Sequence, residues 1–239
     1  MIKNIAIIGS SGALGNAFTQ QLSASYPNAK IHIFSRNPPK ISEPNVVFNS
    51  INYQDEDSIE SAASLASRDA PLDMVIVATG ILHNGALMPE KSLRDLSAHK
   101  FQNLFEANTI FPALVAKHFL PKLNKSNRSV FAALSARVGS ISDNKLGGWY
   151  AYRASKAALN MILKNAAIEI RRSNKKAIVA GLHPGTVDSN LSKPFQGNVP
   201  DGKLFTSEYS VRQLLHVLDN IETQQSGKCF AWDGKEVAP

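Results

Sequence analysis

The sequence has a single cysteine, Cys229, and no long run of apolar residues. One thiol excludes an internal disulfide framework and any metal site built on several cysteines, so a reducing, cytoplasmic compartment is the default expectation. The longest apolar stretch, Met74–Leu82, is interrupted by Thr79 and Gly80, whereas a membrane span needs about 20 apolar residues in a row. The histidines lack the spacing of metal ligands. We therefore expect no membrane segment and no bound metal.

Acidic residues are the scarcer charge, because 19 Asp and Glu stand against 26 Lys and Arg, which gives a net charge of +7. The basic residues are scattered, and the densest groups fall where helices are expected to end, where cations complement the helix dipole. We expect no nucleic-acid partner, although a positive field would attract an anionic cofactor. The basic groups are Lys122, Lys125 and Arg128, and Arg171, Arg172, Lys175 and Lys176.

Short apolar runs alternate with helical patterns along the whole chain, whose 239 residues suit one domain, 1–239. Continuous apolar runs are typical of strands buried on both faces, and this alternation predicts a doubly wound α/β fold with a seven-stranded parallel sheet. The predicted strands are Ile5–Ile8, Ile31–Phe34, Val46–Phe48, Met74–Ala78, Ser129–Leu134, Ala177–Leu182 and Lys228–Trp232. Helices are expected after the first strand, from Asp55, and at Leu93–Lys122, Trp149–Ser173 and Ser207–Ile221, with a long loop at Asp188–Phe205.

A glycine-rich turn, Gly9-Ser-Ser-Gly12-Ala-Leu-Gly15, follows the first predicted strand and leads into a helix. Glycines permit a tight turn and close approach of the backbone to a pyrophosphate, and the free N–H groups at the start of a helix bind such an anion. We therefore predict a dinucleotide site here. Ser11 and Leu14 are expected to contact the cofactor together with the three glycines.

The end of the second predicted strand reads Phe34-Ser35-Arg36-Asn37 and lacks a carboxylate. A NAD site commonly has an acid about 20 residues beyond the glycines, where it binds the ribose 2′-hydroxyl. A guanidinium can instead bind a 2′-phosphate through paired hydrogen bonds. We predict NADP(H) rather than NAD(H), with Ser35 and Arg36 among the contacts. The alternative is that Arg36 is a solvated loop residue.

Two Tyr-x-x-x-Lys patterns occur, and their surroundings separate them. Tyr26–Lys30 contains Pro27 and falls in a predicted turn. Tyr152-Arg-Ala-Ser-Lys156 falls in a predicted helix, where side chains four residues apart share one face. A nearby ammonium favours the phenolate, so we expect the pKa of Tyr152 to lie below the usual value of about 10. Such a tyrosine is a workable general acid at neutral pH.

These motifs, in this order and over essentially the whole chain, resemble the short-chain dehydrogenase/reductase superfamily, in its compact single-domain branch with a Rossmann fold. Asn108 in Glu-Ala-Asn-Thr matches the family's helix asparagine. The segment from Ser135 to Tyr150 is similar to C-factor-like and Sniffer-like carbonyl reductases. By this resemblance the cofactor contacts also include Asn52, Ala78, Thr79, Gly80, Tyr152, Lys156, Pro184, Gly185, Val187 and Ser189.

The resemblance implies an NADPH-dependent oxidoreductase that reduces a small carbonyl substrate. Tyr152 would give its proton to the carbonyl oxygen, and Lys156 would hold the nicotinamide ribose and depress the pKa of the tyrosine. Asn108 would position a water in a proton relay linked to Lys156, and a serine after the fifth strand would polarise the carbonyl. The alternative function is a C-factor-like signalling or regulatory protein that binds the cofactor with little or no catalysis.

Three features depart from the family pattern, and one of them is Val77-Ala-Thr-Gly80, which lacks both asparagines that the family usually has there. The family's serine stands three residues before Gly139, where this chain has Ala136, and Ser135 is one residue early. Neighbouring residues of an extended chain point to opposite faces, so either the loop is shifted and Ser135 serves, or the serine is absent. We expect Ser135 to serve, with Ser140 as the poorer candidate. The third feature is Ala13, which replaces the family's middle glycine. Cofactor binding is expected to be preserved if Gly12, one place earlier, adopts the tight backbone geometry.

Several other residues have two interpretations each. His83 and His183 are either structural or in contact with substrate, and Trp149 either walls the pocket or packs in the core. The segment Leu191–Phe195 belongs to the long loop that closes over substrate in the family. The small-residue helix surface, which would be either a homodimer or homotetramer contact or sheet packing, consists of Ala157, Ala158, Met161, Ala166 and Ala167.

Overall fold

The structure is a computed structural model that describes residues 2–85 and 87–239. Its main sheet has seven parallel strands in the order β3-β2-β1-β4-β5-β6-β9. The predicted strand bounds are confirmed to within one or two residues at each end. The strands are β1 (Asn4–Ile8), β2 (Lys30–Ser35), β3 (Val46–Ser50), β4 (Met74–Val77), β5 (Ser129–Leu134), β6 (Ala177–His183) and β9 (Lys228–Ala231).

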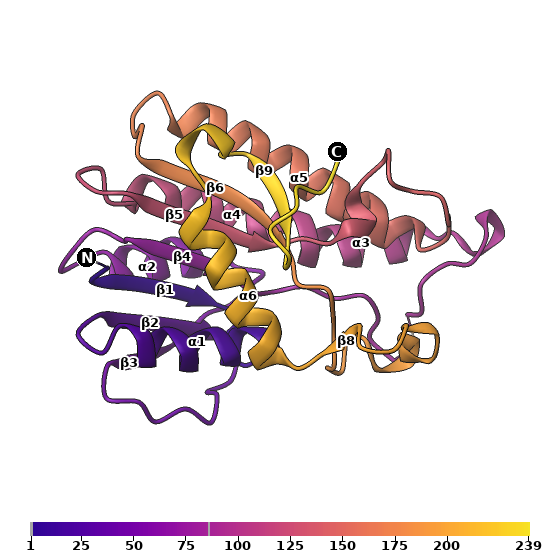
Figure 1. Ribbon diagram of the computed structural model, residues 1–239, viewed down its shortest axis with the longest axis horizontal. Helices are drawn as coiled ribbons and strands as arrows, with labels where there is room; N and C mark the ends of the chain where they lie inside the picture. Colours follow the sequence, from indigo (N-terminus) through magenta and orange to yellow (C-terminus); the bar gives the residue numbers. More distant parts are fainter. Residues whose placement is uncertain (1, 86) are drawn as a thin grey trace.

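Helices cover both faces of this sheet, as the ribbon in Figure 1 shows. The helices α1 (Ala13–Ser25) and α6 (Ser207–Asn220) pack on one face. The other face carries α2 (Glu56–Ala66), α4 (Phe111–Phe119) and α5 (Tyr150–Ile170). No helix of the described residues is both long and apolar enough to cross a membrane.

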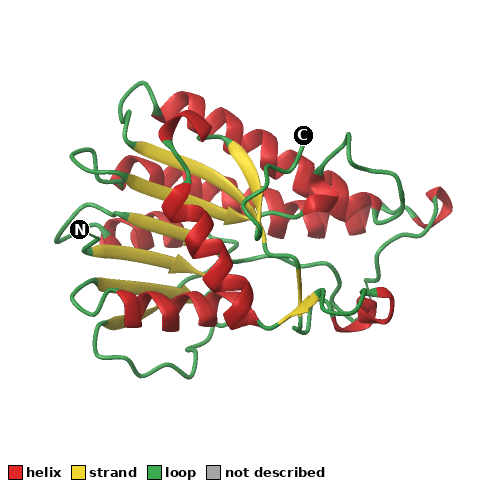
Figure 2. Cartoon of the chain, viewed as in Figure 1, coloured by secondary structure: helices red, strands yellow, loops and turns green. Residues whose placement is uncertain are grey.

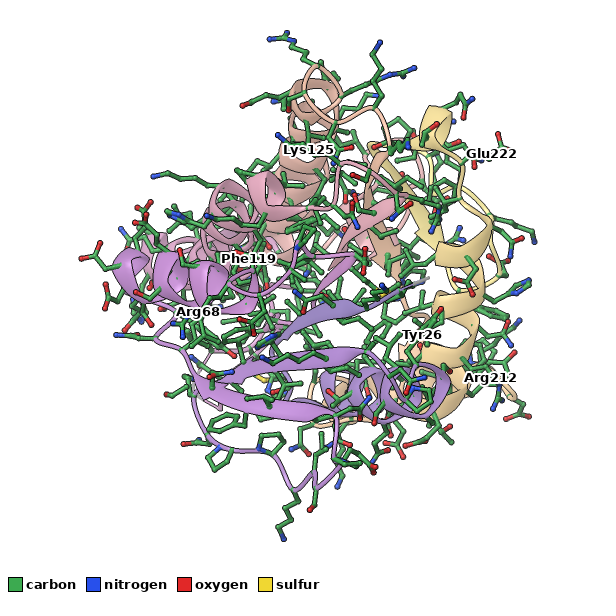
Figure 3. All side chains as sticks on the ribbon, turned by 90° about the vertical axis from the view of Figure 1, so that its left-hand side faces the viewer. Tyr26, Arg68, Phe119, Lys125, Arg212 and Glu222 are labelled. Carbon is green, nitrogen blue, oxygen red and sulfur yellow. The ribbon has the colours of Figure 1, made fainter. Side chains whose placement is uncertain are left out.

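Each strand feeds two cores, because successive side chains point to opposite faces of a sheet. In β1, Ile5 and Ile7 pack with α1 and α6, whereas Ala6 and Ile8 pack with the helices of the other face. Figure 3, seen from the amino ends of the strands, shows the two helical layers and labels Phe119 in the interior, where its side chain is fully buried. The sequence therefore reads as apolar runs because both faces of the central strands are covered.

The strand β3 is an exception to that pattern. It pairs only with β2, at one edge of the sheet, and Val47 and Phe48 are 41% and 37% exposed. The interpretation of this apolar run as a strand buried on both faces was wrong. An edge strand with one neighbour lies partly outside the helical layers, so its apolar side chains reach solvent.

The single long helix predicted at Leu93–Lys122 is also wrong. A short 3-10 turn at Leu93–Asp95 is followed by α3 (Ala98–Phe105), a π-helical turn at Glu106–Ile110, and then α4. Pro112 has no N–H, so an α-helical hydrogen bond to the carbonyl four residues earlier cannot form there. π-helical turns are rare within α-helices and are frequently found at functional sites.

The small-residue surface of α5 divides between its two interpretations. Ala167 is buried in the core beside the sheet, whereas Met161 is 61% exposed. One part of the surface therefore packs on the sheet and another part faces outward. A homo-oligomer contact through the outward part stays a prediction.

The carboxyl ends of the strands carry the longest connections, which project toward the right of Figure 2. The predicted loop after β6 contains structure that its composition did not indicate. A 3-10 segment runs over Lys193–Asn198, and β7 (Thr186–Val187) pairs in parallel with β8 (Leu204–Phe205). This pair holds the two ends of the loop together beside the sheet.

Candidate active site

A cavity of about 570 Å³ opens at the carboxyl ends of the central strands. Doubly wound folds bind their ligands at this edge, and the volume falls in the range of small-molecule and cofactor sites. The predicted contacts that line it are Ser11, Gly12, Leu14, Ala78, Thr79, Gly80, Ser135, Tyr152, Lys156, Pro184, Gly185, Val187 and Ser189. The predicted site residues outside its lining are Gly9, Gly15, Ser35, Arg36, Asn52 and Asn108.

The glycines of the first loop have different roles from those expected. Gly9 has a φ of +91°, and a Cβ on Gly15 would lie 2.1 Å from the carbonyl oxygen of Gly9. Gly12 is extended at φ −76°, and a Cβ there would keep 3.5 Å from the nearest atom. The prediction that Gly12 provides the tight geometry is therefore wrong. Gly9 provides the turn, and Gly15 permits the close approach of α1 to β1.

The start of α1 is suited to an anion. Gly12 is the N-cap of α1, and no side chain of residues 2–85 or 87–239 caps the first amides of the helix. Those N–H groups and the positive end of the helix dipole are available to a phosphate. Nearby, Thr79 Oγ1 is buried and has no hydrogen-bond partner among the described residues. Free amides and an orphaned hydroxyl along one cavity fit a dinucleotide with its pyrophosphate on α1.

Arg36 lies just after β2, beyond the cavity lining. Its guanidinium carbon stands 5.5 Å from the centre of the Tyr53 ring, and the side chain is exposed. Ser35 Oγ donates to the carbonyl of Asn37 at 2.6 Å, and Asn52 Oδ1 accepts from the Gln54 amide at 3.1 Å. Ser35 and Asn52 thus hold their own turns, and their contact with a cofactor stays a prediction.

Asn108 is fully buried in the π-helical turn. Its amide exchanges two hydrogen bonds with the backbone of Ile81, each of 2.8 Å, and also donates to Ser155 Oγ at 3.2 Å. A Cβ on Gly80 would lie 3.4 Å from both Asn108 Oδ1 and Lys156 Nζ. The predicted asparagine and lysine therefore both lie beside Gly80, just beyond the end of β4.

Tyr152 and Lys156 share one face of α5, as the spacing predicts. The Lys156 ammonium donates to the carbonyl of Leu134 at 2.8 Å and lies 6.0 Å from the centre of the Tyr152 ring. Burial lowers the pKa of Lys156 to about 8 and raises the pKa of Tyr152 to about 12. The expectation of a depressed tyrosine pKa is wrong for this structure. Desolvation of the phenolate outweighs an ammonium that bonds elsewhere.

Ser135 lines the cavity, but its hydroxyl does not turn toward Tyr152. Ser135 Oγ donates to Oδ1 of Asn160 on α5 at 2.6 Å. Ala136, at the family's serine position, packs in the same apolar cluster as Tyr152. The Ser135 hydroxyl is thus engaged by Asn160 in this structure, and its role in polarising a substrate carbonyl stays a prediction. The backbone of Ser135 still follows the strand, because its amide donates to Leu182 at 2.8 Å.

The rings of four cavity-lining residues form one wall of the cavity, the aromatic wall, which consists of His83, Trp149, Tyr152 and Phe195. The ring of Trp149 lies 6.2 Å from Tyr152 and 5.0 Å from Phe195, whose ring lies 5.7 Å from His83. His83 Nε2 is also 3.1 Å from the carbonyl oxygen of Asn190. The wall joins the loops after β4 and β6 to the start of α5. It offers an apolar surface to a substrate.

His183 also lines the cavity. Its ring forms no hydrogen bond with the residues that the structure describes, and its Nδ1 is buried. Burial, with Arg137 nearby, lowers the pKa of His183 to about 4. The imidazole is therefore neutral at physiological pH and can still exchange a hydrogen bond with a bound molecule.

The sequence model of the family described as "short chain dehydrogenase" matches residues 3–199. The chain belongs to the short-chain dehydrogenase family. The family, the Rossmann fold and the paired Tyr152 and Lys156 at the cavity together make it an NAD(P)-dependent oxidoreductase.

Two curated proteins are 30% identical to this chain over the aligned residues. The C-signal of Myxococcus xanthus aligns over 70% of the chain and 92% of its own length. The 1-hydroxy-2-glutathionyl-2-methyl-3-butene dehydrogenase of Rhodococcus sp. aligns over 77% of the chain and 76% of its own length.

Solved structures of short-chain dehydrogenases superpose over the whole chain. The NADPH-bound carbonyl reductase from chicken fatty liver has a TM-score of 0.85 at 26% identity, over 100% of this chain and 94% of that chain. The carbonyl reductase Sniffer of D. melanogaster has a TM-score of 0.85 at 22% identity, over 100% of both chains. This second likeness concerns the fold.

Asn160 and Glu90 do not line the cavity, but each bonds to an element of the site, and the sequence analysis singled out neither of them. Asn160 is the partner of Ser135, and Glu90 contacts the start of α5. Each partner is far away in the chain, and neither residue belongs to a motif with a fixed spacing. The only available signal was Ala136, which indicates that the serine position of this site has changed.

Proposed function

We propose that this protein is an NADPH-dependent reductase of small, largely apolar carbonyl compounds. The observation that carries the proposal is the pairing of Tyr152 and Lys156 at one wall of the cavity, below the aromatic side chains of Trp149 and Phe195. A phenol at this point can donate a proton to an oxygen, and the apolar wall favours a substrate with few polar groups.

When bound, NADPH supplies the hydride that reduces the carbonyl carbon to an alcohol. Tyr152 donates its phenolic proton to the oxygen as negative charge develops there. The buried phenol holds that proton at neutral pH, because burial keeps its pKa near 12. Reprotonation of the tyrosine draws on the Lys156 ammonium and the polar groups around Gly80. His183 stays neutral and can donate a hydrogen bond to the same oxygen.

The preference for NADPH rests on Arg36. Its guanidinium is exposed, lies over the face of Tyr53, and has no carboxylate partner among the described residues. A guanidinium held in this way is suited to a 2′-phosphate. The NADPH-bound carbonyl reductase from chicken fatty liver supports this preference.

Cofactor choice is tested with Arg36→Ala. We expect the KM for NADPH to rise about tenfold, which corresponds to the loss of one charge-assisted pair, while the KM for NADH changes little. Equal use of NADH and NADPH by the unchanged protein would contradict the preference.

Activity is tested by following NADPH absorbance with a panel of ketones, aldehydes and quinones. Tyr152→Phe should lower kcat about 10²- to 10⁴-fold with the Kd for NADPH unchanged, because the proton donor is removed but the cofactor site is not. Retained turnover in Tyr152→Phe would refute the proposed role of the phenol.

A second candidate is a signalling or regulatory protein that binds the cofactor with little catalysis. Two observations favour it, namely the 30% identity with the C-signal of Myxococcus xanthus and the absence of a hydroxyl at Ala136. Tight NADPH binding without turnover across the whole panel would support this candidate over the reductase.

A further inference from the structure

Glu90 is a buried acid in the loop between β4 and α3. Its side chain is 1% exposed and forms no ion pair with the described residues. Two oxygen atoms of Glu90 accept hydrogen bonds from the start of α5. The Trp149 amide donates to the Glu90 carbonyl oxygen at 2.6 Å, and the Ala151 amide donates to Glu90 Oε2 at 3.3 Å. Glu90 therefore binds the helix that carries Tyr152.

The start of α5 lacks the features that normally fix a helix end. Its N-cap is Trp149, and no side chain of its own segment caps the first amides. The approach to the helix runs through three left-handed residues, Gly147, Gly148 and Trp149, with φ values of 65°, 63° and 51°. A non-glycine residue in this region is strained and persists only where its surroundings hold it. Glu90 provides that hold from another part of the chain.

The carboxyl group of Glu90 is suited to this task. An acid at a helix N-terminus satisfies an orphan amide and complements the positive end of the helix dipole. Its other oxygen, Oε1, is buried without a partner in the described part of the chain. Burying an incompletely paired carboxyl group is costly. The hydrogen bond from the Ala151 amide is therefore the contact that fixes the position of this side chain.

The same loop also forms part of the cavity. Ile81, Leu82 and His83 line the cavity, and Glu90 is anchored farther along the loop. At the other end of the contact, Ala151 is fully buried and directly precedes Tyr152. Glu90 thus connects the cavity-lining loop after β4 with the first turn of α5, which carries Tyr152.

We propose that Glu90 is a positioning residue for Tyr152. Glu90 caps the start of α5 from a distant loop and so fixes the Tyr152 phenol relative to the cavity-lining residues after β4. This inference rests on the proposed function, since Tyr152 must be the proton donor for its position to matter. A displacement of a reacting group by about 1 Å can cost about 10²-fold in rate. The contact therefore acts on kcat, and not on binding of the cofactor.

Three substitutions test the proposal with one control. Glu90→Met removes the acceptor at similar size, Glu90→Asp keeps the charge but shortens the reach, and Glu90→Gln keeps both reach and an acceptor oxygen. The control is Ser97→Ala, which removes the N-cap bond of α3 to the Lys100 amide, away from the cavity. The readouts are kcat with the best substrate of the panel, the Kd for NADPH, and hydrogen exchange of a peptide covering residues 147–156.

Glu90→Met should lower kcat about 10- to 100-fold with the Kd for NADPH unchanged, and should increase exchange at the start of α5. Glu90→Asp should fall between Glu90→Met and the unchanged protein, and Glu90→Gln should restore most of kcat. Ser97→Ala should lower thermal stability without changing kcat. If Glu90→Met does not fold, the order of Glu90→Gln above Glu90→Asp in kcat still decides the question.

Equal kcat values for Glu90→Asp, Glu90→Gln and the unchanged protein would overturn the proposal, as would unchanged exchange over residues 147–156 in Glu90→Asp. Failure of the proposed function is separable from this outcome. It appears as retained turnover in Tyr152→Phe, or as no turnover in the unchanged protein, whereas the exchange measurement reports on the Glu90 contact without any substrate.

Discussion

The hydroxyl of Ser135 donates a hydrogen bond to Oδ1 of Asn160 at 2.6 Å, across the interface between the end of β5 and α5. The next residue, Ala136, contributes only a methyl group to the apolar cluster around Tyr152. The serine of this segment therefore fastens the helix to the sheet. We expect a carbonyl oxygen bound beside Tyr152 to take a second hydrogen bond from His183, which lines the same cavity and is neutral because burial lowers its pKa to about 4.

Replacing Ser135 and Ala136 separates structure from catalysis. Ser135→Ala should lower the free energy of unfolding by about 1–3 kcal/mol, because Asn160 Oδ1 loses a buried partner, and should change kcat little. Ala136→Ser should raise kcat by placing a hydroxyl beside Tyr152. Urea unfolding and steady-state kinetics measure the two effects. A large loss of kcat in Ser135→Ala, with an unchanged free energy of unfolding, would show that Ser135 polarises the substrate carbonyl.

The first glycine loop offers a matched pair of substitutions. Gly15→Ala should prevent folding or NADPH binding, because its Cβ would lie 2.1 Å from the Gly9 carbonyl oxygen. Gly12→Ala should fold normally, since its Cβ would have 3.5 Å of space at an ordinary extended φ. Thermal unfolding and NADPH fluorescence titration check both. Equal behaviour of the two variants would contradict the assigned roles.

The buried lysine predicts a pH dependence of the reduction. Burial lowers the pKa of Lys156 from 10.5 to about 8, so the ammonium loses its proton as the pH rises through that value. We expect kcat/KM for carbonyl reduction to fall above about pH 8, because kcat/KM reports on groups of the free enzyme. In Lys156→Arg the residual kcat/KM should not fall above about pH 8, since a guanidinium stays charged. If the fall in kcat/KM above pH 8 persists in Lys156→Arg, another titrating group causes it.

The buried histidine predicts a pH dependence of stability. His183 has a pKa of about 4 in the folded protein against 6.5 as its ordinary value, so the unfolded chain binds more protons between these two values. Stability should therefore fall as the pH drops from 6.5 toward 4, by about 1–2 kcal/mol after allowance for partial exposure. His183→Gln should remove this part of the acid loss, as measured by urea unfolding at pH 7 and pH 5. An identical acid loss in both proteins would contradict burial of the neutral ring.

The central strands were predictable because each is an apolar run whose residues feed two cores. The run at Val46–Phe48 was predicted as a strand, but its position at the edge could not be predicted, because strand order depends on pairing between distant segments. The interruption at Asn108 had one local cause, Pro112, but the sequence did not show whether the helix would bend, break or form a π-helical turn there.

The pairing of Tyr152 with Lys156 was determined by the sequence alone, because residues four apart on a helix share a face whatever surrounds them. The glycine turn and the βα alternation likewise follow from short-range backbone geometry. The electrostatics and orientation of the site were decided by tertiary structure. Burial raised the phenol pKa instead of lowering it, a rotamer turned Ser135 toward Asn160, and Glu90 reached the start of α5 from a distant loop. Desolvation and long-range contacts depend on which segments meet in space, and no spacing along the chain encodes that.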